Sequence, residues 1–235
     1  MKNLILCFFI LFIGIESFGQ DLQIPSTSFS KKKTTYITLD DGTEISGTLK
    51  DLDYKKGIIK KIKIENADGK KVKLSPENIN FMYLPQSNLD KFNKLTKFAS
   101  DATLWKSKNI DQSKIGEGYI YFEKATLAKG KKESQLIFQL LNTSFSDNVK
   151  IYHDPFAQET LAVGVGGVAL AGGDAKSYYV KVGDEPAFRL KKKDYKDLFS
   201  KLWADCPAVI EKYGDKIKWT EFPNHVFDYT NECNK

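Results

Sequence analysis

The chain has 235 residues, and 36 Lys and Arg against 30 Asp and Glu give it a formal net charge of +6. Apolar residues make up 41% and aromatic residues 13%, enough for a hydrophobic core, which excludes a disordered or collagen-like chain. The mean hydropathy is −0.39 and only one apolar run reaches twelve residues, which excludes a polytopic membrane protein.

Residues 1–20 have the layout of a secretory signal peptide. Lys2 gives a positive start, residues 4–15 form an apolar run, and small or polar residues follow as far as Gln20. Twelve helical residues span about 18 Å, well short of the roughly 30 Å hydrocarbon core of a bilayer. We therefore expect cleavage and export, with an uncleaved membrane anchor as the alternative.

Residues 21–34 contain Pro, Ser, Thr and three successive lysines, and they predict a flexible, solvated lead-in. Residues 35–85 then alternate between apolar and polar positions in five short stretches, as half-buried β-strands do. Short linkers join the five stretches. This pattern predicts a small five-stranded barrel of the SH3-like or Sm-like kind.

Two three-residue turns in this region, 40–42 and 67–69, end in Gly, which can adopt the left-handed conformation that closes such a hairpin. The length of each turn fixes which residues face each other across the hairpin. The apolar pairs expected from this register are Ile37 with Ile45, Ile62 with Leu74, and Ile64 with Val72.

The same register gathers charged side chains on the opposite face, with Lys63 opposite Lys73, Lys61 beside them, and Glu65 opposite Lys71. We take the four lysines as candidate ligand-binding residues for a polyanion such as an acidic glycan or lipid headgroups. The alternative is a solvated strand face whose lysines prevent edge-to-edge pairing. The stripe contains no arginine or aromatic residue, so nucleic acid is not expected as a partner.

Residues 86–115 are interpreted as a helical linker, with a short helix over 88–99. Residues 116–235 predict a larger antiparallel sheet or sandwich followed by helices, which makes the whole chain mainly β (α+β). The expected strands lie at 119–122, 135–141, 149–152, 177–182 and 187–190. Asp194 is the expected N-cap of a first C-terminal helix.

The segment Asp205-Cys206-Pro207 interrupts the helical pattern, and we expect a second helix capped by Asp205 and ending at Gly214. Residues 219–235 are rich in aromatic side chains and are expected to pack onto the sheet. Once residues 1–20 are removed, Cys206 and Cys233 are the two cysteines left, and export favours a disulfide between them. Two buried free thiols are the alternative, and no metal site is expected.

Reactive motifs are scarce. The glycine-rich stretch 164–173 has Ala169 where a dinucleotide-binding loop needs its third glycine, so a close-packed glycine connection is the better interpretation. His153 and Asp154 are adjacent on a strand, which points them to opposite faces. We assign no catalytic residue and no cofactor. A glycan hydrolase needs only two carboxylates, so motifs do not exclude one.

Several segments together resemble a group of uncharacterised exported β-rich proteins typical of Bacteroidota. The resemblance is carried by the export signal ending in Phe-Gly-Gln, the strand-rich 37–83 unit, Tyr-His-Asp-Pro at 152–155, Ser-Tyr-Tyr-Val at 177–180 and the stretch 199–207. It implies an envelope location and transfers no activity and no catalytic residue.

Two hypotheses follow for the function. The favoured one is a non-enzymatic exported protein, periplasmic, outer-membrane-associated or secreted, that binds another envelope protein, an acidic glycan or a membrane surface. The alternative is a glycan or cell-wall hydrolase acting through paired carboxylates in a cleft.

Overall fold

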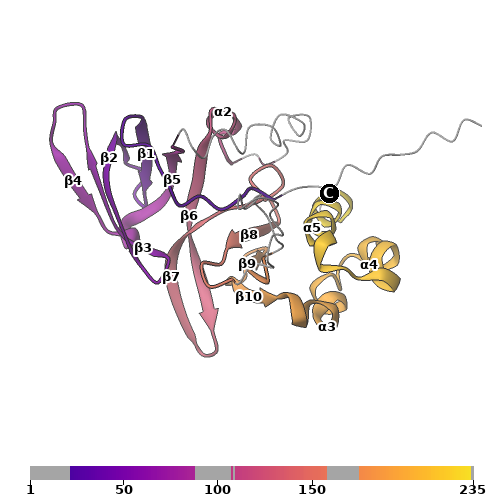
Figure 1. The fold of residues 1–235 in the computed structure, drawn as a ribbon. Coiled ribbons are helices and arrows are strands. Elements are labelled where there is room, and N and C mark those ends of the chain that lie inside the picture. Colours follow the sequence, from indigo (N-terminus) through magenta and orange to yellow (C-terminus); the bar gives the residue numbers. More distant parts are fainter. Residues whose placement is uncertain (1–21, 88–106, 108, 158–174, 234–235) are drawn as a thin grey trace, which may run out of the picture.

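The computed structural model describes residues 22–87, 107, 109–157 and 175–233. It is mainly β, with a seven-stranded antiparallel sheet, a three-stranded antiparallel sheet and C-terminal helices (Figure 1). The predicted fold class is therefore confirmed. The expected signal peptide at 1–20, the expected helix at 88–99 and the glycine-rich stretch at 164–173 lie outside the described residues.

The first sheet has the strand order β4-β3-β2-β1-β5-β6-β7, and every neighbouring pair is antiparallel. Its strands are β1 (Thr34–Leu39), β2 (Glu44–Lys55), β3 (Ile58–Glu65), β4 (Lys71–Leu74), β5 (Ile79–Pro85), β6 (Tyr119–Lys129) and β7 (Lys132–Gln139). One 3-10 turn, Pro76–Asn78, precedes β5, and a short helix, α2 (Gln112–Gly116), precedes β6.

The first five strands do not form the separate closed barrel that the sequence predicts. Strand β5 pairs with β1 on one side and with β6 on the other, so its second edge extends the sheet into the downstream half of the chain. The sheet still encloses an apolar core on one face. Buried side chains from both halves meet there, among them Ile37, Ile62, Met82, Phe122 and Ile137.

The hairpin register follows the prediction. Ile37 faces Ile45, Ile62 faces Leu74 and Ile64 faces Val72. Gly42 and Gly69 close their turns with φ angles of 84° and 76°, which residues with a Cβ atom rarely adopt.

The expected solvated lead-in is instead packed along the sheet from residue 22 onward. The Gln23 amide donates to the Leu141 carbonyl at 2.8 Å, and the Ser26 amide donates to Oε1 of the buried Gln139 at 2.9 Å. Phe29 packs edge-on against Phe122, with ring centroids 5.8 Å apart. A single aromatic anchor and backbone hydrogen bonds thus hold a segment whose composition is polar.

The second sheet, with the order β10-β9-β8, is smaller than predicted because the strands near 119–122 and 135–141 joined the first sheet. It comprises β8 (Val149–His153), β9 (Ser177–Val182) and β10 (Phe188–Lys191). An aromatic layer between the two sheets includes Phe138, Tyr152 and Tyr179, and the Phe138 and Tyr179 rings lie 5.1 Å apart. The two sheets meet at this layer, and isolated β-bridges join Leu127 to Ala187 and Leu140 to Tyr152.

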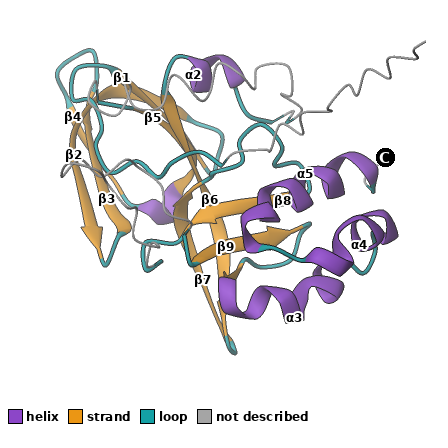
Figure 2. Cartoon of the chain, turned by 45° about the vertical axis from the view of Figure 1, so that its right-hand side comes forward, coloured by secondary structure: helices purple, strands orange, loops and turns teal. Residues whose placement is uncertain are grey.

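The C-terminal helices cover the other face of the second sheet (Figure 2). They are α3 (Lys192–Leu202), α4 (Pro207–Tyr213) and α5 (Phe222–Glu232), with single 3-10 turns at Gly214–Lys216 and Trp219–Glu221. As expected, the tail aromatics pack on the sheet: the Trp219 and Tyr178 rings stack at 5.4 Å.

The helix starts differ slightly from the prediction. Asp194 lies in the first turn of α3 rather than at its N-cap, which is Lys191, and α4 has Cys206 rather than Asp205 at its N-cap. Asp205 accepts a hydrogen bond from the Tyr229 hydroxyl at 2.7 Å instead. Because Pro207 occupies the first position of α4 and has no amide hydrogen, the helix begins there without a side-chain cap.

Cys206 and Cys233 form a disulfide in the structure, with their Cα atoms 5.5 Å apart and a sequence separation of 27 residues. The bond joins the start of α4 to the end of α5. The predicted pairing is confirmed, and Cys206 is fully buried beneath these helices.

Candidate binding face on strands β2 to β4

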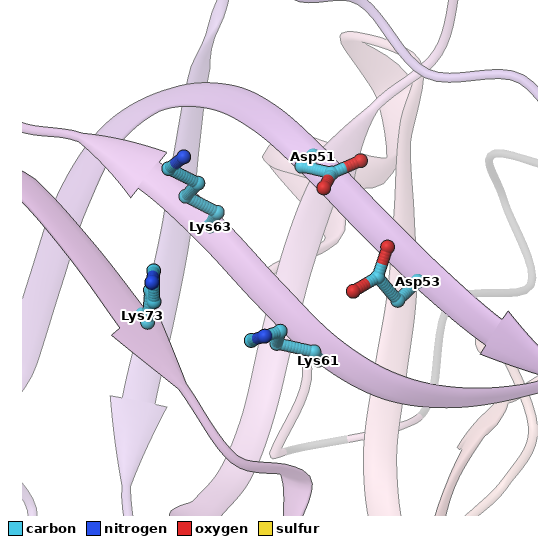
Figure 3. Close-up of a pocket in the computed structure, with 5 residues that line it drawn as sticks. All are labelled: Asp51, Asp53, Lys61, Lys63 and Lys73. Carbon is cyan, nitrogen blue, oxygen red and sulfur yellow. The ribbon is translucent and has the colours of Figure 1, made fainter.

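The predicted lysines lie on the face of β3 and β4 that points away from the apolar core (Figure 3). Lys63 faces Lys73 across the β3–β4 ladder, and Lys71 faces Glu65 one step further along, as the sequence predicts. Lys61 lies two residues from Lys63 on the same side of β3.

Two aspartates on the neighbouring strand share this face, and sequence reasoning missed them. Asp51 on β2 is paired with Lys63, and Asp53 is paired with Lys61. These two carboxylates and Lys61, Lys63 and Lys73 line one shallow hollow (Figure 3). We call these five residues the β2–β4 charged face.

The β2–β4 charged face is divided rather than uniformly basic. Its carboxylates lie along β2, and its ammonium groups lie along β3 and β4. Neighbouring strands are about 4.8 Å apart and alternate residues on a strand about 6.6 Å apart, so charges of each sign form a row. A partner that is acidic along one edge fits this pattern better than a uniform polyanion does.

These charges are not neutralised by close contacts within the described part of the chain. All members except Lys63 are exposed, and none of the three lysines lies within 4.0 Å of a carboxylate oxygen there. Glu65 differs, because it forms an ion pair with Lys50 at 3.1 Å. The lysines of the face are therefore available to an external partner.

The His153 and Asp154 pair has a structural role rather than an acid–base one. Asp154 is buried and accepts hydrogen bonds from Arg189 Nε and Ser177 Oγ, each at 2.6 Å. Burial lowers the pKa of His153, and the nearby Asp154 carboxylate opposes that shift only in part. The imidazole is thus neutral at neutral pH, while Asp154 is fully occupied by its partners.

The other buried carboxylate, Glu123, is held in the same way. It accepts a hydrogen bond from the Tyr152 hydroxyl at 2.6 Å and pairs with Lys150 at 2.7 Å. A hollow outside the β2–β4 charged face is lined by three carboxylates, Glu133, Asp184 and Glu185, and all three are exposed. A glycosidase acid has to give its proton to the substrate, whereas Asp154 and Glu123 are each engaged by a cation and a hydroxyl group of the protein.

Within the described ranges, no cluster of three or more His, Cys, Asp or Glu side chains is placed to hold a metal ion. No helix in the same ranges is both long and apolar enough to cross a bilayer.

His225 lies far from the β2–β4 charged face in the chain, inside the helical layer, and is fully buried. Its Nδ1 is 2.5 Å from the Tyr195 hydroxyl, and no described group is hydrogen-bonded to its Nε2. Burial lowers the pKa of His225 from 6.5 to about 4, although the nearby Glu221 and Asp228 carboxylates favour the charged ring. Lys212 also faces the ring and favours the neutral form.

We expect acid to destabilise the protein through this histidine. The unfolded chain binds its proton below about pH 6.5 and the folded chain only near pH 4, so stability is complete above pH 6.5 and falls as the pH drops to 4. The loss is on the order of 3 kcal/mol at the acid end. Urea unfolding of the wild type and of His225→Phe at pH 7.5, 6 and 4.5 measures it.

The free energy of unfolding of the His225→Phe variant should decline less steeply with falling pH, because a phenyl ring cannot bind a proton. His153→Gln is the matched control and should remove only the smaller contribution of that half-buried histidine. Equal pH slopes for the wild type and His225→Phe would show that His225 is not protonated on unfolding.

The fold and the site define a class: a two-sheet antiparallel β protein with a helical cover, carrying an exposed charged sheet face. Comparison with protein-family models, with curated proteins and with solved structures finds no match.

Proposed function

We propose that the protein is an exported, non-enzymatic binding module whose β2–β4 charged face binds an acidic envelope component. The observation that carries the proposal is the set of three lysines on two paired strands, with no carboxylate within 4.0 Å among the described residues. A sheet holds the backbone of these three lysines at fixed spacing, so little backbone order has to be gained on binding.

The two aspartates on β2 limit which kinds of acidic partner can bind the face. A flat anionic bilayer pressed on the face would bring negative headgroups over Asp51 and Asp53 as well as over the lysines. A protein or glycan with an acidic edge can contact β3 and β4 while avoiding β2. We therefore favour such a partner over a membrane surface.

Export is supported by the amino-terminal pattern of residues 1–20 and by the Cys206–Cys233 disulfide, since such bonds persist in oxidising compartments. The buried carboxylates Asp154 and Glu123 are each engaged by a cation and a hydroxyl group of the protein, which supports a binding role over the hydrolase hypothesis.

Heparin, a sulfated glycan, is a suitable acidic probe. We expect the variant with Lys61→Glu, Lys63→Glu and Lys73→Glu to bind heparin about tenfold or more weakly at low salt, because three attractive charges become repulsive. The measurement is isothermal titration or retention on immobilised heparin over a sodium chloride gradient.

The matched control carries Lys193→Glu, Lys196→Glu and Lys201→Glu, three exposed lysines of α3. It changes the net charge by the same amount but should retain most of the heparin affinity. Asp51→Asn with Asp53→Asn should strengthen binding. Equal losses in the two triple variants would contradict the proposal, because net charge and not the β2–β4 charged face would then govern binding.

A further inference from the structure

A second hollow lies on the opposite side of the β2–β3 hairpin from the β2–β4 charged face. It has a volume of about 350 Å³ and lies between the hairpin, β7, the end of β8 and the segment at residues 26–27. Small-molecule sites typically measure roughly 300–1,000 Å³. Two of its walls are apolar, with Tyr54 and Ile59 from the hairpin and Ile137 and Phe138 from β7.

The hairpin tip is fixed against the end of β8 in a way that defines the hollow. Lys56 and Gly57 form the turn with φ angles of 53° and 74°, the left-handed pair that a two-residue hairpin turn requires. A Cβ atom added at Gly57 would lie 2.4 Å from the Cβ of Pro155, so only glycine permits this close approach. The wall is thus built into the fold rather than formed by a swinging side chain.

The opposite rim is also held in place. Gln139, which is buried at the base, binds the Ser26 amide through Oε1, and Gln86 donates to the Ser26 hydroxyl at 3.1 Å. The segment at residues 26–27 therefore forms a fixed side of the hollow, and the Thr27 side chain at its edge is exposed.

The charge of the lining selects the kind of ligand. Among the residues that the structure describes, no Lys, Arg, Asp or Glu lines the hollow. Its polar groups are hydroxyls, one amide and the His153 ring, whose pKa is lowered by burial so that it is neutral at neutral pH. An ionised ligand would lose water there without gaining a counter-charge.

We propose that this hollow is a binding site for an uncharged, mainly apolar small molecule, such as an alkyl chain that ends in a hydroxyl group. The apolar walls take the chain, and the neutral hydroxyl, amide and imidazole groups take the polar end. This site is separate from the β2–β4 charged face and does not depend on the function proposed for that face.

The uncharged dye N-phenyl-1-naphthylamine is the probe, and its fluorescence rises in an apolar environment. We expect saturable binding to the exported protein with one site per chain, and displacement by 1-decanol at lower concentrations than by decanoate. Thr27→Trp should fill the mouth and weaken dye binding about tenfold, whereas Ser28→Trp, at an exposed neighbour outside the lining, should not.

Tyr54→Ala removes one wall and should also weaken dye binding, with Tyr36→Ala as its control because both tyrosines are partly exposed but only Tyr54 lines the hollow. Near-ultraviolet circular dichroism confirms that each variant is folded. Absence of saturable dye binding, or unchanged binding by folded Thr27→Trp, would overturn the site. Displacement by decanoate at concentrations equal to those of decanol would overturn the assignment of an uncharged ligand.

Discussion

Replacing Arg189 with Met is expected to lower the free energy of unfolding by about 3–5 kcal/mol, because it leaves a buried carboxylate without its cation. The Asp154 side chain has no exposed surface, and Arg189 Nε lies 2.6 Å from its Oδ2. The same guanidinium donates to the Phe156 carbonyl at 3.1 Å, so it also holds the chain that leaves β8. Arg189 is the single arginine of the chain.

The measurement is urea unfolding at neutral pH, with a double-mutant cycle that adds Asp154→Asn. The double variant should be more stable than Arg189→Met alone, because the amide has no charge to leave unpaired. Lys191→Met on the same strand is exposed and should change stability by no more than about 0.5 kcal/mol. A loss of similar size in Lys191→Met would point to strand propensity instead of the ion pair.

The hairpins were predictable because the residues that fix their strand pairing lie close together in the sequence. A glycine at the end of a three-residue turn fixes the pairing, and the apolar alternation on both sides agrees with it, as Ile62 and Leu74 illustrate. The pairing of β5 with β6 was not predictable in the same way. It joins Phe81–Pro85 to Tyr119–Glu123 across more than thirty residues, and no turn fixes that register.

The sequence predicted the lysines of the β2–β4 charged face but not its aspartates, because only the lysines are brought together by a local turn. Lys63 and Lys73 are brought together by one short turn, whereas Asp51 and Asp53 come from the next strand, whose ladder with β3 contains two irregularities. A signal was present in the sequence: Asp51-Leu52-Asp53 alternates, and Lys56-Gly57 can form a two-residue turn. Extending β2 to Lys55 would have placed both aspartates beside the lysines.

The uncharged hollow could not be predicted, because the residues that line it come from five segments separated in sequence. The lead-in at residues 26–27 contributes one wall because Ser26 is hydrogen-bonded to Gln139 and Gln86. No local sequence pattern predicts these two long-range hydrogen bonds. Only the packing of the two sheets brings these pieces together.

Removing the Cys206–Cys233 bond is expected to cost about 3.5 kcal/mol in the free energy of unfolding. The cysteines are 27 residues apart, and on the chain-entropy model the bond restricts the unfolded chain by that amount. The closed loop contains all of α4 and α5, whose buried residues Val209, Phe222 and Val226 share one core with the second sheet. We therefore expect the helical layer to lose stability before the first sheet does.

Urea unfolding of the disulfide-bonded protein with and without a reducing agent measures this cost, and the Cys206→Ala, Cys233→Ala variant provides the comparison. Because Cys206 is fully buried, the variant also loses packing of its sulfur atom, whereas reduction of the wild type does not. The reduced wild type should thus be less stable than the oxidised protein, and the variant should not respond to the reductant. An intact mass showing two free thiols in exported protein would contradict the disulfide and remove the basis for this stabilisation.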